Sequence, residues 1–387
     1  MPSSTDPARP LAVGAETPER GGDEALESAL RERLRRARRE RTCPGAALAV
    51  LERGRPRLEL LEGRWTYAED SPPVELDSLF DLASLTKVLA TTALAARCHE
   101  EGRPALDEAG PDSEPAPRRL LAHAAGFPAC IPPIPDHDRG PEDPAVRQAA
   151  RAAMRAARDH PGAPAAEPAT LYSDLGFIAL GERLAGPGAL AEAVEREILG
   201  PAGLSGGAEP GVGVAVAGRG QPLAKALPSE RRPGGVARRG LVHDELAAAL
   251  GGFAGHAGLF GNLRGVVRLV QLWIPGVGAE LWSPRTTAEF IRPARLDPAS
   301  SRALGWETGL TGRAAGGPGW PAGDWFGHTG YTGGCVWITP LGDGFVLLTN
   351  RTWPQRPAPE VGSREIHRLR ADIGRMLAEG PLRGLLP

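Results

Sequence analysis

Apolar residues recur at helical spacing near the start of the chain. Leu26, Leu30 and Leu34 lie four residues apart, and arginines and glutamates fill the positions between them. This spacing places the leucines on one face of a helix, while the charged residues on the other faces can pair with one another. Asp23 is suited to cap such a helix and Pro44 to end it. The pattern predicts a helix with one buried face between these two residues.

Short apolar runs at both ends of the chain predict strands. Residues 46–52 and 58–62 are two such runs, and the turn-forming residues 53–56 separate them. Three further runs, at 324–329, 335–339 and 344–350, are separated by glycine-containing turns, and a helical pattern covers 363–378. We expect the first and last strands to meet in one sheet, because the middle of the chain shows helical patterns instead of strand patterns.

Helical patterns dominate that middle part. An apolar helix follows Ser84 and ends at Gly102, and further helical segments are predicted at 118–124, 145–158, 175–184, 189–199, 243–250 and 264–273. Residues 206–240 are rich in Gly, Pro, Ala and Arg without any period, which predicts a loop. The expected organisation is a disordered tail at 1–22, a discontinuous sheet domain at 23–83 and 295–387, and a mainly helical domain at 84–294.

Composition narrows the class of protein. The 387 residues are 41% hydrophobic and 24% charged with a net charge of −2, as in ordinary globular proteins, so no nucleic-acid partner is indicated. No apolar run is long enough to span a membrane, and residues 1–22 do not read as a signal peptide, so we expect a cytoplasmic protein. Cysteines stand at 43, 98, 130 and 335 without a Cys-x-x-Cys pair, which predicts free thiols rather than a zinc knuckle or redox motif.

The candidate chemistry begins with Ser84-Leu85-Thr86-Lys87 at the start of the apolar helix. A spacing of three places the serine hydroxyl and the lysine amine on one face. The amide groups and dipole at a helix start also favour negative charge that develops on the serine. This is the arrangement of an activated nucleophile, although the tetrad alone is also compatible with a capping serine and a solvated lysine.

Two other motifs supply groups that such a nucleophile needs. Tyr172, in the sequence Leu-Tyr-Ser-Asp, stands at the start of a helical stretch, and a phenolate beside a lysine ammonium can act as a base. His328-Thr329-Gly330 lies at the end of a predicted strand, where the glycine lets a substrate approach the backbone. Taken singly, the tyrosine is compatible with packing and the second motif with a turn.

Together and in this order, the motifs resemble the serine penicillin-recognising superfamily, which includes β-lactamases and penicillin-binding proteins. The resemblance is to its class C-like group, which includes D-alanyl-D-alanine peptidases and family VIII esterases. It covers the chain from about residue 23 onward, and its motifs are FDLASLTK at 80–87, LLAHAAGFP at 120–128, YSDLGF at 172–177, GHAGLF at 255–260, GHTGYTG at 327–333 and LTNR at 348–351. VHDE at 242–245 together with GHAG is similar to a subgroup of uncharacterised hydrolases in this superfamily.

The resemblance implies an α+β, β-lactamase-like fold: an antiparallel sheet flanked by terminal helices, with an inserted helical domain. It implies Ser84 as nucleophile, with Lys87 and Tyr172 as the proton-handling groups; which of the two takes the first proton stays open. The oxyanion would bind to the backbone amides of Ser84 and Tyr331. Substrate-binding positions would be Asp174, His328, Thr329 and Gly330. No cofactor or metal is implied, and the substrate would be a small ester, amide or peptide.

Two positions depart from the family pattern. Asp174 replaces an asparagine, and an ionised aspartate cannot donate a hydrogen bond to a substrate carbonyl. His328 replaces a lysine, so a permanent cation for a substrate carboxylate is missing. If His328 faces the substrate, its protonation near neutral pH should strengthen carboxylate binding as the pH falls; the competing interpretation is that His328 packs or hydrogen-bonds within the strand. Both changes favour an esterase or peptidase over a true β-lactamase.

Two alternatives stay open at this point. His123, His243, Asp244 and His256 are residue types that bind metal, so a metal-dependent hydrolase is one alternative, although no His-Glu-x-x-His spacing is present. The other is a non-catalytic sensor that keeps Ser84 and traps an acyl group. The oligomeric state is not indicated by the sequence.

Overall fold

The computed structural model describes residues 20–103, 106–110, 114–129, 143–159, 170–205, 211–217, 223–231, 235–309, 324–355 and 364–380. The predicted tail therefore lies outside the described residues, except for residues 20–22. These three belong to the first helix, α1 (Arg20–Arg39), so the expected helix start at Asp23 is wrong by three residues.

The centre of the fold is a six-stranded antiparallel sheet in the order β2-β1-β11-β10-β9-β8. The strands are β1 (Gly45–Glu52), β2 (Arg55–Gly63), β8 (Glu307–Thr308), β9 (Phe326–Thr329), β10 (Cys335–Ile338) and β11 (Gly344–Thr349). The expected meeting of the first and last segments is confirmed, since β1 pairs with β11 from Ala46 opposite Thr349 onward. Arg53 and Gly54, with φ of 49° and 74°, form the tight turn between β1 and β2.

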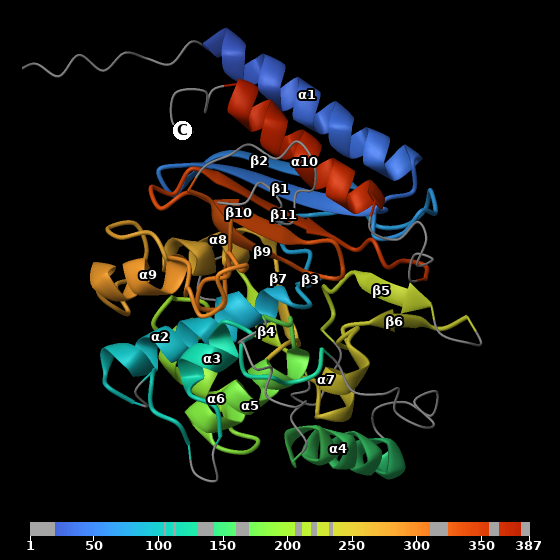
Figure 1. Cartoon of the computed structure of the whole chain (residues 1–387). Coiled ribbons are helices and arrows are strands. Elements are labelled where there is room, and N and C mark those ends of the chain that lie inside the picture. The colour runs from blue at the N-terminus through green and yellow to red at the C-terminus, as the bar shows by residue number, and fades with distance from the viewer. Residues whose placement is uncertain are drawn as a thin grey trace, which may run out of the picture.

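The terminal helices cover one face of this sheet. Figure 1 shows α1, in blue, and α10 (Arg364–Glu379), in red, side by side above the strands. Leu30 and Leu369 pack there against Leu48 and Val50 of β1, and all four are fully buried. The intervening residue Ala49 points to the opposite face and joins the larger core of the helical part. Strand β1 is thus buried on both faces, which explains its nearly continuous apolar run.

The helical part lies on the other face of the sheet. Its elements are η1 (Lys87–Thr91), α2 (Thr92–Glu100), α3 (Pro117–Leu121), α4 (Pro144–Asp159), α5 (Asp174–Ala185), α6 (Leu190–Val194), η4 (Glu195–Leu199), α7 (Glu245–Ala249), α8 (Leu263–Gln271) and α9 (Pro284–Ile291). All except α9 overlap a predicted helical segment. The helix after Ser84 begins with a π-helical turn, η1, a distortion that is frequent at functional sites.

Aromatic residues join α9 to the sheet. The rings of Trp273 and Trp306 lie 5.3 Å apart edge to face, and Trp306 meets Phe326 of β9 at 5.2 Å. Phe290 of α9 contacts the same Trp273 ring at 5.9 Å. Since each of these rings is essentially inaccessible to solvent, the cluster fixes the helical part against the strand that carries His328.

The predicted loop at 206–240 contains three short strands, so that part of the prediction is wrong. They are β4 (Val214–Val216), β5 (Pro228–Arg231) and β6 (Ala237–Arg239). Strand β4 joins β3 (Phe80–Asp81) and β7 (Leu259–Gly261) in a second sheet, whereas β5 pairs with β6. Each gains its hydrogen bonds from another segment, so no local period could reveal it.

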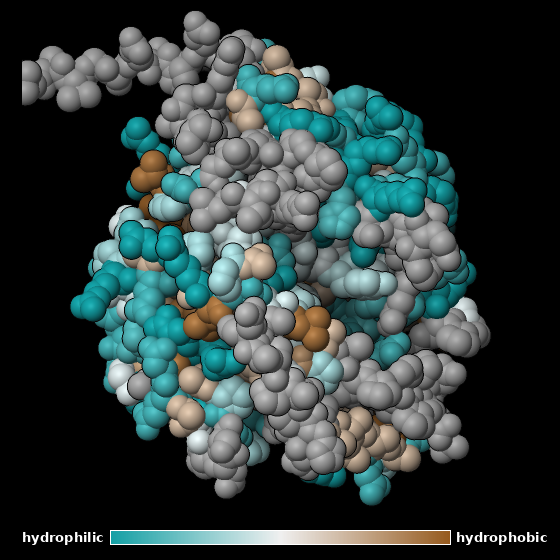
Figure 2. Space-filling view, viewed as in Figure 1, coloured by the Kyte–Doolittle hydropathy of each residue, from teal (hydrophilic) through white to brown (hydrophobic). Residues whose placement is uncertain are grey.

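The surface is mostly polar. On the face shown in Figure 2, hydrophilic residues cover most of the coloured area and apolar residues form small separate patches. No helix among the described residues is both long and apolar enough to cross a bilayer. Cys43, Cys98 and Cys335 are buried free thiols, as predicted, and burial raises their pKa values; Cys130 lies outside the described residues.

Candidate active site

Ser84 follows a strained turn at the end of β3. Ala83 has a φ of 45°, which residues with a side chain rarely adopt, and its amide donates a hydrogen bond of 2.8 Å to Asp81 Oδ1. Helical hydrogen bonding begins at once, since the Lys87 amide donates to the Ser84 carbonyl at 3.1 Å. Strain of this kind concentrates at functional sites. The turn fixes the direction in which the Ser84 side chain leaves the backbone.

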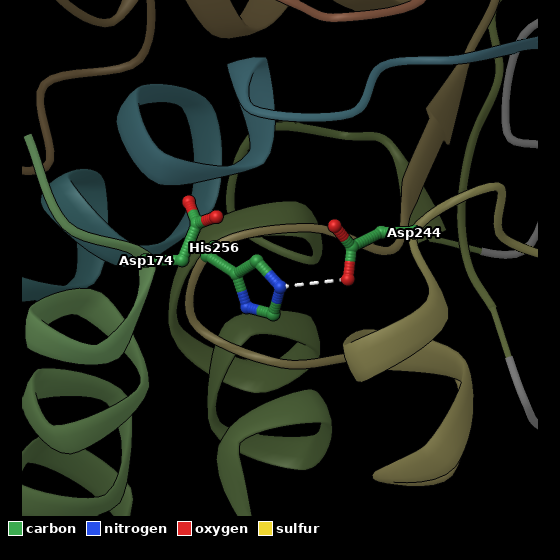
Figure 3. A group of neighbouring side chains, drawn as sticks. All are labelled: Asp174, Asp244 and His256. Atoms are coloured by element: carbon green, nitrogen blue, oxygen red, sulfur yellow. Dashed lines mark hydrogen bonds and ion pairs between the residues drawn. The ribbon is translucent and has the colours of Figure 1, made fainter. Parts of the chain in front are cut away.

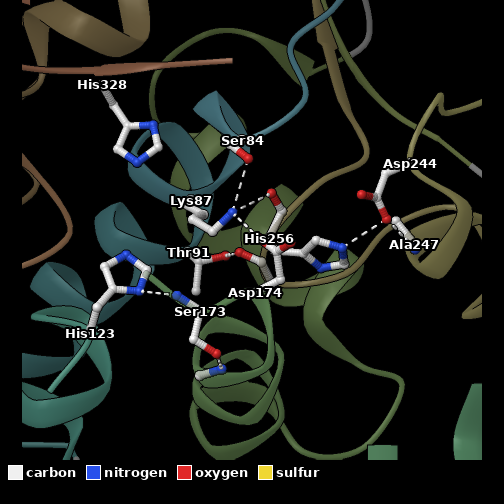
Figure 4. Close-up of polar contacts among 12 residues, drawn as sticks. Ser84, Lys87, Thr91, His123, Ser173, Asp174, Asp244, Ala247, His256 and His328 are labelled. Carbon is white, nitrogen blue, oxygen red and sulfur yellow. Dashed lines mark hydrogen bonds and ion pairs between the residues drawn. The ribbon is translucent and has the colours of Figure 1, made fainter. Parts of the chain in front are cut away.

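Lys87 has no exposed surface and makes several polar contacts. Its Nζ donates to Ser84 Oγ at 3.0 Å, to Asp174 Oδ1 at 2.7 Å and to the His256 carbonyl at 3.4 Å. Figure 4 shows these contacts converging on one nitrogen from three parts of the chain. An ammonium group has three protons to donate, and the Tyr172 hydroxyl is a further hydrogen-bond partner of this nitrogen.

The charge on Lys87 depends on its neighbours. Burial acts to lower the pKa of Lys87, but Tyr172 and Asp174 more than offset it, so the pKa is raised above its usual value of 10.5. Lys87 is therefore an ammonium group at neutral pH in the free protein. It can stabilise negative charge on Ser84 Oγ, but it must first lose a proton before it can act as a base.

Tyr172 lies beside Lys87, although 85 positions separate them in the sequence. Lys87 Nζ is 4.8 Å from the centre of the Tyr172 ring, and the Arg302 guanidinium carbon is 5.1 Å from it. The His123 and His328 rings lie 4.5 and 5.9 Å from it. His123 also anchors the segment before α5, because its Nδ1 accepts a hydrogen bond of 3.0 Å from the Ser173 amide.

The end of β9 closes the site. A Cβ on Gly330 would come within 2.6 Å of the Leu82 carbonyl, so only glycine allows this strand so near the turn that carries Ser84. Thr332 Oγ1 adds a hydrogen bond of 2.7 Å to the Asp81 carbonyl. Among the hydrogen bonds of the described residues, none uses the amide of Ser84 or Tyr331 as donor. Both amides are therefore available to an oxyanion from substrate.

His328 differs from its prediction. The side chain is 2% exposed and lies at the Tyr172 ring, and its Nδ1 donates to the Thr329 carbonyl at 2.8 Å. Burial, followed by the nearby charges of Lys87 and Arg302, holds the pKa of His328 well below its usual value of 6.5. The expectation that His328 titrates near neutral pH is wrong, because a buried site beside two cations disfavours imidazolium.

Asp174, Asp244 and His256 form the cluster shown in Figure 3, and Asp174 also contacts Lys87. One potential ligand atom from each lies within 4.8 Å of the other two. However, His256 Nε2 is already paired with Asp244 Oδ1 at 2.9 Å, and Asp174 is paired with the Lys87 ammonium. His256 also holds the pKa of Asp244 below its usual range against the effect of burial. Lys87 thus already supplies a cation to this cluster, while His123 and His243 are not members of it.

Two residues at the site were not predicted. Asp81 is 5% exposed, and burial raises the pKa of its carboxyl; besides Ala83 it accepts a hydrogen bond of 2.6 Å from the His243 amide. An acidic residue three positions before the serine, among apolar neighbours, was a signal for this role. Arg302 lies in the irregular segment between α9 and β8, where no pattern marked it.

Comparison with known proteins agrees with this geometry. The Beta-lactamase family model matches residues 27–366. The chain belongs to this family. The resemblance of the motifs to the β-lactamase-like superfamily is thereby confirmed. A putative D-alanyl-D-alanine carboxypeptidase of Salmonella agona is 34% identical over 130 residues, which are 32% of this chain and 29% of that protein. The chain therefore matches less than a third of the length of that relative.

Solved structures show the same fold at lower identity. A class C β-lactamase from Rhodobacter sphaeroides is 20% identical with a TM-score of 0.63, over 91% of this chain and 99% of that one. An octameric penicillin-binding protein homologue from Pyrococcus abyssi is 17% identical with a TM-score of 0.65, over 94% and 77%. Simvastatin synthase LovD from Aspergillus terreus is 19% identical with a TM-score of 0.61, over 93% and 99%. The predicted β-lactamase-like α+β fold is confirmed.

Proposed function

We propose that this family member hydrolyses small esters or amides through an acyl-enzyme on Ser84, and that it prefers esters or peptides to β-lactams. The observation that carries the proposal is the hydrogen bond of 3.0 Å between the fully buried Lys87 and Ser84 Oγ. A buried ammonium beside a hydroxyl is a recurring arrangement for activating a nucleophile. Ser84 would lie at the junction of the two proposed domains, 23–83 with 295–387 and 84–294.

The proposed reaction has two halves, acylation of Ser84 and hydrolysis of the acyl-serine. Ser84 Oγ forms a bond to the acyl carbon while its proton passes to the phenolate of Tyr172 or to the neutral amine of Lys87, whichever of the two has first released its own proton to solvent. The amides of Ser84 and Tyr331 stabilise the oxyanion. The protonated base then returns the proton to the leaving group as that bond breaks, which leaves an acyl-serine. Water cleaves the ester in a second cycle of the same kind. The Lys87 ammonium of the free protein favours the phenolate form of the neighbouring Tyr172, so Tyr172 is the favoured first base.

The substrate preference follows from the two departures from the family pattern. Asp174 faces Lys87 and has no N–H to donate to the carbonyl of a β-lactam side chain. His328 is neutral, so it offers no cation to the carboxylate that β-lactams carry. Neutral esters and peptides depend least on the missing amide donor and the missing cation, so they should lose the least binding free energy. Thr329 and Gly330 would also line the binding site of these substrates.

The test is hydrolysis of a short-chain p-nitrophenyl ester by the purified full chain. Ser84→Ala should lose nearly all activity, and Ser229→Ala, a buried serine of β5, should keep it. A metal chelator should have no effect. Activity that survives in Ser84→Ala or disappears with chelator would replace the serine mechanism by a metal-dependent one. A single burst without turnover would support the acyl-trapping sensor instead.

A further inference from the structure

Two cations face the ring of Tyr172, and each is also paired with a carboxylate, Lys87 with Asp174 and Arg302 with Glu307. Lys87 Nζ lies 4.8 Å from the ring centre but also 2.7 Å from a carboxylate oxygen of Asp174. Arg302 places its guanidinium carbon 5.1 Å from the same ring centre. The family pattern has a third cation at position 328, where this chain has a neutral histidine. Arg302 therefore restores a positive charge to the surroundings of the proposed base.

The position of Arg302 is fixed from several sides. Its carbonyl accepts a hydrogen bond of 2.8 Å from the Ala294 amide, and its own amide donates to Ser300 Oγ at 3.2 Å. Its Nη2 donates to Glu307 Oε1 at 3.1 Å, with both side chains 20% exposed. The guanidinium is thus held in place by β8 on one side and by the loop backbone on the other.

One end of the Arg302 side chain has no ordinary partner. Nη1 is buried and makes no hydrogen bond to any part of the chain that the structure describes. Burying an N–H group without a partner costs free energy, about 1–3 kcal/mol and more when the group is charged. The face of an aromatic ring attracts a cation and offsets part of that cost. Pairing with Glu307 alone does not account for a guanidinium that stands over this ring and has Nη1 buried without a partner.

We propose that Arg302 is a positioning residue for Tyr172: its guanidinium fixes the ring next to Lys87 and Ser84, and its charge stabilises the phenolate that accepts the proton of Ser84. The inference rests on the proposed function and names the cation that substitutes for the family lysine. In the acylation step the proton leaves Ser84 Oγ for Tyr172 Oη as the bond to the acyl carbon forms. The phenol then passes this proton to the leaving group.

The other charged and titratable groups around Tyr172 and Arg302 come from five parts of the chain. Lys87 on η1 is paired with Asp174 on α5, while His123, which follows α3, and His328 on β9 have pKa values held well below 6.5 by burial and by Arg302 and Lys87. Both histidines are therefore neutral over the working range. Glu307 of β8 is the carboxylate that faces Arg302 itself. A change in the acid limb of the plot of kcat/KM against pH, caused by substituting Arg302, would therefore report on the protonation of Tyr172.

The experiment measures kcat/KM for a neutral p-nitrophenyl ester against pH in full-length protein. Arg302→Gln should move the acid limb upward by about one pH unit, which lowers kcat/KM about tenfold at the acid end, mainly through kcat. Arg302→Lys should recover most of the shift because it restores the charge. Arg264→Gln is the matched control, since Arg264 pairs with Glu59 far from Tyr172, and it should leave the profile unchanged.

The outcomes separate this inference from the proposed function. An unchanged profile in Arg302→Gln, with Ser84→Ala inactive, would overturn the role of Arg302 and leave the nucleophile in place. Activity in Ser84→Ala would overturn the proposed function itself. If Arg302→Gln does not fold, Glu307→Gln provides the test: it removes the neutralising carboxylate, so the acid limb should move to lower pH. No movement, or movement to higher pH, would overturn the inference.

Discussion

Lys87 Nζ lies closer to Asp174 Oδ1, at 2.7 Å, than to Ser84 Oγ, at 3.0 Å. The residue that departs from the family pattern is therefore the strongest partner of the central lysine. This contact ties the first and second motifs together across 87 positions of sequence. It also means that the consequences of the Asp174 substitution extend from substrate recognition to the protonation of Lys87.

Asp174→Asn should reduce the stability of the protein. The Lys87 ammonium would remain buried without its carboxylate partner, which should lower the free energy of unfolding by about 2 kcal/mol, less than for a fully buried pair because Asp174 is partly exposed. The pKa of Lys87 is raised in the folded state, so this contribution is complete below the usual value of 10.5 and is lost only as the pH rises through the folded-state pKa. The loss should therefore be constant from about pH 6 to 9 in urea unfolding.

A double-mutant cycle provides the control for this prediction. Lys87→Met with Asp174→Asn should be less destabilised than the sum of the single variants, because the two side chains interact directly. Additive losses would contradict the ion pair as a stabilising contact.

The same substitution should improve β-lactam turnover. We expect wild-type protein to hydrolyse nitrocefin slowly or not at all relative to a p-nitrophenyl ester. Asp174→Asn restores an amide that can donate to the substrate carbonyl, and one such hydrogen bond corresponds to about a fivefold gain in nitrocefin kcat/KM. Nitrocefin turnover by wild type that matches ester turnover would show that Asp174 does not disfavour β-lactams.

His328 should not act as a pH sensor for substrate charge. Its pKa lies well below 6.5, so it stays neutral across the range from about pH 5.5 to 8.5, which brackets the usual histidine value. The KM values of matched anionic and neutral esters should follow parallel pH profiles. A KM that falls selectively for the anionic ester at low pH would mean that His328 is protonated in the complex.

The lowered pKa of His328 has a second consequence, for stability. Below about pH 6.5 the unfolded chain binds a proton at this residue and the folded chain does not, so stability is complete above that pH and falls as the pH decreases. His328→Asn removes the titrating group and should flatten the decline in urea-unfolding free energy between about pH 6.5 and 5. An equal slope in the variant and the wild type would contradict the assignment.

Gly330→Ala should damage activity more than stability. The added Cβ would come within 2.6 Å of the Leu82 carbonyl and would push β9 away from the turn that carries Ser84. We expect a loss of kcat of at least about tenfold, since small displacements of reacting groups are costly. Gly176→Ala in α5 is the matched control, because its Cβ would meet nothing nearer than 3.8 Å and alanine favours a helix. Equal activity of both variants would contradict the role of Gly330.

The sequence predicted the site where the signal is local. Ser84 and Lys87 stand three positions apart on one helical turn, so their contact follows from helical geometry alone. The order of the motifs along the chain also predicted that Tyr172 and the strand β9 lie near Ser84. The sheet was also predictable, because each of its long strands carries its own apolar run and the hairpin turn at Arg53 and Gly54 is marked by a glycine.

Other features depend on distant segments and left no local mark. Strands β3 and β4 contain two and three residues and exist only because both pair with β7. The burial of His328 is decided by residues from other elements, so its unperturbed pKa was a poor guide. Arg302 lies in an irregular segment, and its proposed role depends on its contact with the ring of Tyr172, a residue distant in the sequence. Helix α9, by contrast, had a Ser283 cap and Pro284 that could have been recognised.

We propose that Ser84 forms a covalent acyl intermediate. This proposal is tested most directly by incubating the full chain with a slowly deacylating p-nitrophenyl ester, quenching with acid and measuring intact and peptide masses. We expect one acyl group per chain, located on the peptide that contains Ser84 and absent from Ser84→Ala. An acyl group on another residue, or ester turnover with no acylated protein under conditions where deacylation is rate-limiting, would contradict the account.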